Sequence, residues 1–116
     1  MISNPNPEAV SKIALQVGRE GAFHAIYHEI QLKSTLYKEA EEYLLNNNDN
    51  DDKILKSCYQ SIIMKAKQLA RKYTKDLTEI EVKSIYNGED DIYHKILREV
   101  EKELKKEVNK KYDPSV

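Results

Sequence analysis

One short stretch, residues 17–29, gathers most of the side chains that could take part in chemistry. It contains His24 and His28, two of the three histidines, together with Arg19 and Glu20. Glu20, His24 and His28 are spaced by four residues, so a helix would place them on one face, where they could hold a divalent metal ion. The paired motifs typical of zinc and di-iron sites are absent. We therefore expect no native metal and interpret this face as exposed or partner-facing.

Arg19 and His24 are separated by four residues in the sequence REGAFH. This spacing is similar to the Arg-x4–6-His motif of HEPN ribonucleases, which are small helical domains that cleave RNA at a dimer interface. The resemblance implies that Arg19 would stabilise the phosphate and that His24 would assist proton transfer. The motif commonly lies late in that family's domain and lies early here, so a ribonuclease is the third functional hypothesis. No serine has the surroundings of a catalytic nucleophile, and we do not expect an enzyme.

A second candidate site is the segment 53–75, which holds seven basic residues and no acidic one. Its neighbours, 39–52 and 76–91, each contain six acidic residues. On a helix, five of the basic side chains would follow one narrow stripe away from the apolar face. These five are Lys53, Lys56, Lys67, Arg71 and Lys75. Such a row could follow a phosphate backbone, bind an acidic partner, or form a solvated face balanced by the acidic segments.

The elements that must position these residues are helices. Apolar residues recur at spacings of three and four, and the alternation typical of strands is missing. We expect an all-α fold, an irregular bundle of four to five helices. Residues 1–116 are expected to form a single helical domain, with an N-terminal tail at 1–6, a polar linker at 46–52 and a C-terminal tail at 113–116.

The first helical segment has two apolar stripes that do not line up. Residues 10–17 form one stripe, and the stripe from Ala22 onward lies well over 90° around the helix from it. We expect a long helix that changes partners near Gly18–Gly21, or two helices that meet there. A helix with two apolar faces is expected to contact both its own core and a second chain. The expected interface residues are Val17, Gly18, Gly21, His24 and His28.

The later segments have clearer helix signals. A helix over 53–75 would bury one apolar face that includes Cys58. A short helix at Glu79–Tyr86 would begin with a capping box formed by Thr78 and Glu81, and Gly88 would stop it. It is expected to pack Leu77, Ile80 and Ile85. The last helix, after Asp90 or Asp91, has one apolar stripe: Ile92, Ile96, Val100, Leu104 and Val108.

Composition limits the function classes. The 19 basic and 20 acidic residues give a net charge of −1, so overall charge favours no partner class. The single cysteine excludes an internal disulfide. No apolar run is long enough to span a membrane, and no signal peptide pattern is present, so we expect a cytoplasmic protein.

The leading hypothesis is a small non-enzymatic helical interaction protein, such as an accessory subunit, an adaptor or a protein inhibitor. It would bind a protein partner or self-associate through helix faces. The alternative is an RNA- or DNA-binding module that uses the basic stripe. No cofactor, no small-molecule substrate and no membrane contact are expected.

Overall fold

The chain forms an irregular bundle of helices, which confirms the predicted fold class. The computed structural model describes residues 7–46 and 52–112, and the side chains within 12–46 and 52–109. No strand occurs in these ranges. The expected tails and residues 47–51 of the expected linker lie outside the described residues. The five helices of the described ranges are α1 (Pro7–Lys33), α2 (Thr35–Asn46), α3 (Lys53–Thr74), α4 (Glu79–Tyr86) and α5 (Asp90–Tyr112).

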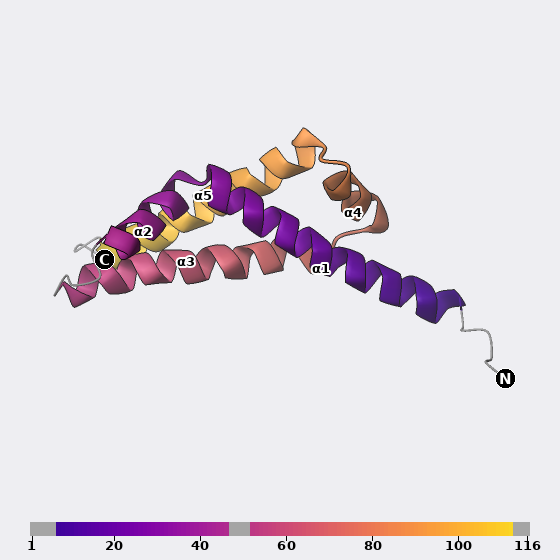
Figure 1. Ribbon diagram of the computed structural model, residues 1–116, viewed down its shortest axis with the longest axis horizontal. Coiled ribbons are helices and arrows are strands. Elements are labelled where there is room, and N and C mark those ends of the chain that lie inside the picture. Colours follow the sequence, from indigo (N-terminus) through magenta and orange to yellow (C-terminus); the bar gives the residue numbers. More distant parts are fainter. Residues whose placement is uncertain (1–6, 47–51, 113–116) are drawn as a thin grey trace.

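The helix α3 packs against α1, α2 and α5. The short helix α4 packs against α1 and α5, and the N-terminal part of α1 extends beyond the other helices (Figure 1). The core is built from all five helices and the turn after α3. Its buried members are Ala22, Phe23, Ile26, Ile30, Tyr37, Ala40, Ile62, Ala66, Leu69, Ala70, Leu77, Val82, Ile85, Ile96, Val100 and Leu104.

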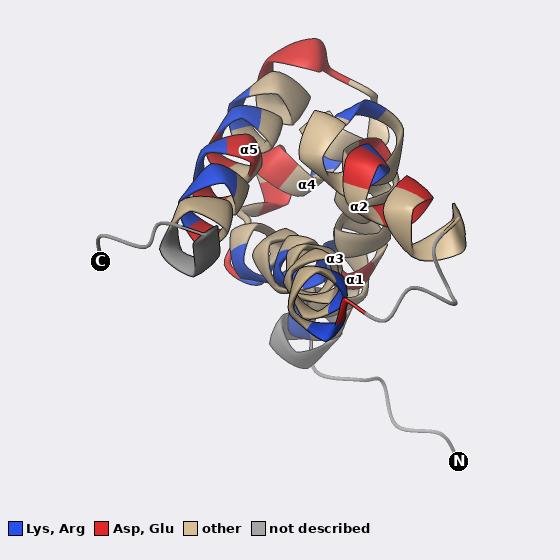
Figure 2. Ribbon diagram, turned by 90° about the vertical axis from the view of Figure 1, so that its left-hand side faces the viewer, with Lys and Arg blue, Asp and Glu red and all other residues tan. Residues whose placement is uncertain are grey.

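The predicted apolar stripes of α3 and α5 face this core. In α3, Cys58 and Ile62 are buried as expected, and in α5 the same holds for Ile96 and Val100. The other face of α5 carries lysine, arginine, aspartate and glutamate interleaved along its length (Figure 2). This mixture of charges is typical of a solvated helix face.

The helix α1 is continuous through both of its glycines, so the long-helix alternative is correct and the broken one is wrong. The interruption comes later, at Ser34, which the sequence pattern does not predict. The backbone N–H of Ser34 donates to Ile30 O at 2.9 Å, and its carbonyl accepts from Lys38 N at 3.0 Å. Ser34 therefore closes the last turn of α1 and opens the first turn of α2, and the two helices meet at a kink with only this residue between them.

The two glycines of α1 mark the place where α4 packs against its backbone. A Cβ atom on Gly18 would lie 2.9 Å from Val82 Cγ1, and one on Gly21 would overlap the hydroxyl of Tyr86. That hydroxyl donates a hydrogen bond of 3.3 Å to the carbonyl oxygen of Gly18. The close approach of α4 leaves little room for a side chain at Gly18, and room for one at Gly21 only if Tyr86 moves.

Alanine at these two glycines is expected to have opposite effects on stability. Either change gains about 1 kcal/mol of helix propensity. At Gly18 the new methyl group meets buried Val82, and overpacking costs roughly 1–3 kcal/mol, so Gly18→Ala should destabilise the fold. At Gly21 it meets Tyr86, whose side chain is 59% exposed and can turn into solvent, so Gly21→Ala should be neutral or stabilising. Urea unfolding of both variants measures the difference, and equal midpoints would contradict this account.

The helix α4 begins and ends as the sequence predicts. The Thr78 hydroxyl accepts from Glu81 N, and the Glu81 carboxylate accepts from Thr78 N, which completes the capping box. The second of these bonds lowers the pKa of Glu81 from its ordinary value. After the helix, Gly88 adopts a φ of 70°, the left-handed conformation that favours glycine. The expected burial of Ile80 is wrong: this side chain is 78% exposed, and Val82 packs on the core instead.

Candidate interaction surface

The side of α1 that points away from the core carries two large aliphatic residues. Ile13 is 62% exposed and Val17 is 65% exposed. At 100° per residue, these two side chains fall within an arc of about 60° that also holds His24 and His28. The core residue Ile26 lies on the opposite side of the helix. We call the surface formed by Ile13, Val17, His24 and His28 the outward face of α1.

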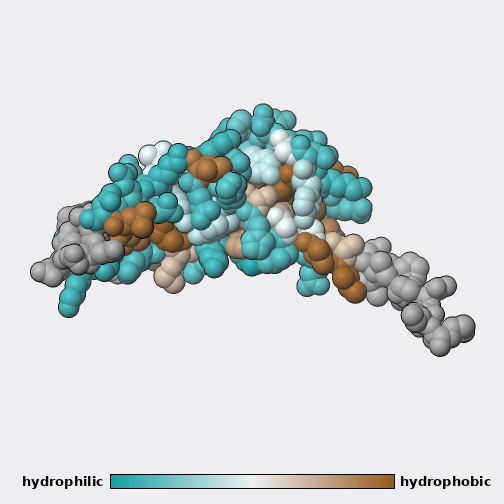
Figure 3. Space-filling model, in the orientation of Figure 1, coloured by the Kyte–Doolittle hydropathy of each residue, from teal (hydrophilic) through white to brown (hydrophobic). Residues whose placement is uncertain are grey.

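Two features place the outward face in solvent. The N-terminal part of α1 passes beyond the ends of the neighbouring helices, so little of the bundle can cover it (Figure 1). The space-filling view shows an apolar patch on this part of the molecule, next to the grey N-terminal residues (Figure 3). Single exposed aliphatic residues are ordinary, but Ile13 and Val17 are neighbours one helical turn apart. They form a short apolar ridge.

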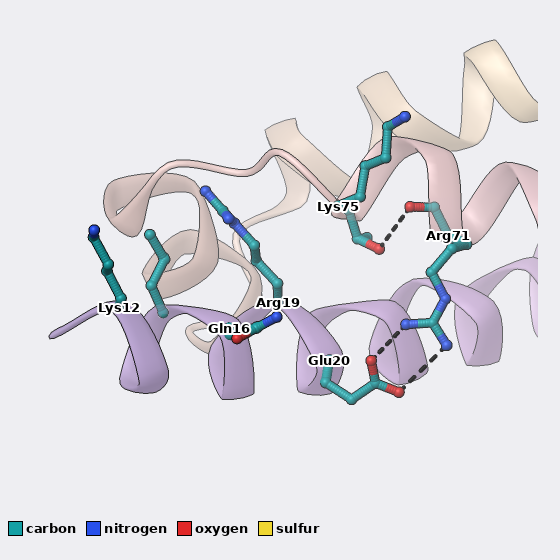
Figure 4. A pocket seen from close by; sticks show the side chains of 8 residues that line it. Lys12, Gln16, Arg19, Glu20, Arg71 and Lys75 are labelled. Atoms are coloured by element: carbon teal, nitrogen blue, oxygen red, sulfur yellow. Dashed lines mark hydrogen bonds and ion pairs between the residues drawn. The ribbon is translucent and has the colours of Figure 1, made fainter. Parts of the chain in front are cut away.

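A cleft lies on the neighbouring side of α1, between this helix and the C-terminal end of α3. Its volume is about 370 Å³. Figure 4 shows the side chains that line it and their origin on the two helices. The lining residues are Lys12, Leu15, Gln16, Arg19, Glu20, Arg71, Thr74 and Lys75. Four of these side chains are cationic at neutral pH and one is a carboxylate. We call this cavity the basic cleft.

The guanidinium of Arg71 is held in place by two partners on α1. Its two terminal nitrogens donate to the two carboxylate oxygens of Glu20. Its central carbon also lies 3.8 Å from the centre of the Phe23 ring, in a cation–π contact. The hydrogen bond from Arg71 lowers the pKa of Glu20 from its ordinary value, and the nearby charge of Arg71 acts in the same direction. Glu20 therefore already has an ion-pair partner, Arg71.

The other three cations of the basic cleft have no carboxylate partner among the described residues. The Nε of Arg19 donates a hydrogen bond of 2.8 Å to Leu77 O. This bond does not use the two terminal nitrogens of the guanidinium. The side chains of Lys12 and Lys75 are both exposed at the walls of the cleft. Figure 4 shows Lys12, Arg19 and Lys75 on the same side of α1, with Lys12 and Lys75 at opposite ends of the cleft and the Lys75 ammonium pointing away from the other two. The three positive charges are therefore spread along the cleft.

The predicted basic stripe is only partly brought into this cleft. Arg71 and Lys75 line it, at the C-terminal end of α3. Lys67 lies beside a separate shallow hollow bordered by Phe23 and Met64. Lys53 begins α3 at its other end, with Lys56 one turn further on. The five side chains thus lie along the length of α3. The charge of one of them, Arg71, is balanced by its ion pair with Glu20, so the row of unpaired cations is not continuous.

The histidines do not gather further metal ligands. His24 Nε2 lies 3.7 Å from a carboxylate oxygen of Glu20, and the His24 side chain is 72% exposed. His28 is also exposed. No group of three or more histidine, cysteine, aspartate or glutamate side chains suited to a metal ion occurs among the described residues.

The structure separates Arg19 from His24. Arg19 enters the basic cleft and reaches the turn after α3, whereas His24 lies on the outward face, against the edge of the Phe23 ring. The cleft lined by Arg19 does not include His24. The predicted interface residues are also divided: Val17, His24 and His28 point outward, while the glycines contact α4 of the same chain.

The sequence interpretation missed Lys12, Gln16 and the role of Arg19 as a cation of the cleft. A signal for part of this was present, because Lys12 and Arg19 are seven residues apart and so share a helix face. The contribution of Lys75 depends on how α3 crosses α1, and no pattern within either helix contains that information.

Comparison with protein-family models, with curated proteins and with solved structures found no match to this chain. In the described part of the chain, no helix is both long enough and apolar enough to cross a membrane.

Proposed function

We propose that this protein binds a protein partner through the outward face of α1 and acts without catalysis of its own, as an accessory subunit, an adaptor or an inhibitor. The observation that carries the proposal is the apolar ridge of Ile13 and Val17 on the free side of a helix whose other side forms the core. Burying one such side chain in a partner's surface stabilises a complex by roughly 1.5–3 kcal/mol.

The outward face is presented on a helix that is already held in place. Tyr86 donates a hydrogen bond to the carbonyl oxygen of Gly18, and the part-buried bond from Arg19 to Leu77 O joins α1 to the turn before α4. A preformed helix loses less conformational entropy on binding than a flexible segment, and so more of the contact energy becomes affinity. The histidines continue the face toward the C-terminus of α1, where they add amphipathic contact area.

The proposal is tested by placing a photo-crosslinking amino acid, p-benzoylphenylalanine, at Val17, with Lys102 on the exposed side of α5 as the matched control. A defined protein adduct is expected at position 17 and not at position 102. An adduct with twice the mass of the chain would identify a second copy as the partner. In the chain that carries the crosslinker at position 17, Ile13→Asp should abolish capture of the same partner, because an unpaired carboxylate is costly to bury. No adduct at position 17 above the control would contradict the proposal.

Binding of RNA or DNA along α3 is the second candidate. It is favoured by the absence of acidic residues from the whole of α3, on which Lys53 and Lys67 are exposed, with exposed Lys75 directly after the helix. It predicts binding to an oligonucleotide that weakens steeply as salt is raised, and that is lost when Lys67 and Arg71 are changed to glutamate. Filter binding at low salt decides it, and no retained RNA or DNA removes this candidate.

A further inference from the structure

We infer that the basic cleft is the docking site for an acidic segment of the protein partner, an inference that rests on the proposed function and names the partner's chemistry. The cleft holds four cations against one carboxylate, Glu20, and that carboxylate is occupied by Arg71. Because Lys12, Arg19 and Lys75 have no carboxylate partner within the described residues, the charge they carry is available to one or more anionic side chains of a ligand.

The two guanidinium groups of the cleft are oriented by neighbouring groups before any ligand binds. The Nε bond to Leu77 fixes the plane of the Arg19 guanidinium, and the Phe23 ring and Glu20 fix that of Arg71. A guanidinium held this way binds a carboxylate with little loss of side-chain freedom. Lys75 follows Arg71 by one turn, and its backbone N–H donates to Arg71 O at 3.0 Å, so it stands at the end of the same wall.

The surroundings favour the carboxylates of a protein over the phosphates of a nucleic acid. Leu15 lines the cleft and the ridge of Ile13 and Val17 lies on the next side of α1, so an occupant that also covers them must carry apolar side chains. None of the residues that line the cleft is aromatic, which removes the stacking platform that single strands use. The positive charge is local in a chain of net charge −1, and it forms a cluster, not a long track.

A second copy of this chain does not fit the cleft well. Its exposed acidic side chains include Glu39, Glu41 and Glu42 on α2, which lies at the opposite end of the molecule from the N-terminal half of α1 (Figure 1), and Asp76 and Glu79 close to the cleft. Pairing α2 with the cleft would join copies head to tail, an arrangement that makes open chains unless the rotation closes it into a ring. Pairing through Asp76 or Glu79 would bring two positively charged clefts together. The occupant is therefore a different protein, with acidic residues beside apolar ones.

The test measures binding of a fluorescein-labelled decaglutamate peptide by fluorescence anisotropy at low salt. The variant Lys12→Glu/Lys75→Glu is compared with Lys102→Glu/Lys105→Glu, which makes the same change of charge on the exposed side of α5. The cleft variant is expected to bind about tenfold more weakly, and the α5 variant to stay within about twofold of the unaltered chain. Binding should also weaken as salt is raised toward 0.1 M and beyond.

Three results would overturn the inference: no binding of decaglutamate to the unaltered chain, equal losses in the two variants, or tighter binding of a ten-nucleotide oligo-dT that is lost in the cleft variant. Circular dichroism checks that both variants are folded. Lys12→Ala/Lys75→Ala serves as the milder cleft variant where the charge reversal unfolds the chain. Crosslinking at position 17 separates this inference from the proposed function. If the adduct at position 17 forms but decaglutamate does not bind, the inference about the basic cleft is wrong and the proposed function stands. If no adduct forms at position 17, the proposed function is wrong.

Discussion

Leu104→Ala is expected to lower the free energy of unfolding by about 2–5 kcal/mol, which is the largest effect of any change considered for this chain. The Leu104 side chain has no solvent exposure and belongs to the buried cluster to which each of the five described helices contributes. Removing three carbon atoms there loses their transfer free energy and leaves a cavity that the neighbouring helices fill only in part. A domain of this size is stabilised by about 5–15 kcal/mol, so the loss is a large part of the total.

A matched control for Leu104 exists on α2. Leu45 is the same residue type in a helix, and it is 71% exposed, so Leu45→Ala should change stability by no more than about 0.5 kcal/mol. Urea denaturation followed by far-ultraviolet circular dichroism measures both variants. Similar midpoints for the two would mean that α5 does not pack on the bundle as the structure has it, and the account of the core would then have to be abandoned.

The core was largely predictable because α5 and α3 carry their apolar residues on one side only. Ile96, Val100 and Leu104 follow one stripe, and a helix with one apolar side has one way to face a core. The capping box of Thr78 and Glu81 was predictable for a similar reason, since both its hydrogen bonds join residues three apart. Ile80 was assigned wrongly because α4 is a helix of eight residues, too short for its apolar spacing to define a single face.

Features that depend on two distant segments could not be predicted. The basic cleft requires Lys12 and Arg19 to meet Lys75, and α1 and α3 show no pattern that specifies their crossing. The kink at Ser34 is a stronger example. Apolar spacing continues through it from Ile30 to Tyr37, so a single longer helix is the natural expectation. The partner that holds the Ser34 hydroxyl is Glu101, 67 residues away in the chain.

Ser34→Ala is expected to destabilise the fold by about 1–3 kcal/mol, because it leaves polar groups unpaired at a buried position. The Ser34 side chain is 1% exposed and makes two hydrogen bonds. Its hydroxyl accepts from Tyr37 N at 3.2 Å, as an N-cap residue does at the start of a helix, and it donates to the carboxylate of Glu101 on α5. One hydroxyl therefore starts α2 and joins the kink to a third helix.

The control for Ser34 is Ser57, which is exposed on α3 and where alanine should be neutral or slightly stabilising. Thermal unfolding of Ser34→Ala, Glu101→Ala and the double variant measures the coupling between the two side chains. A direct bond predicts that the double variant loses less than the sum of the single losses, with a coupling energy of about 0.5–3 kcal/mol. Strict additivity, or a Ser34→Ala variant as stable as Ser57→Ala, would show that the kink is held by backbone packing and not by this hydroxyl.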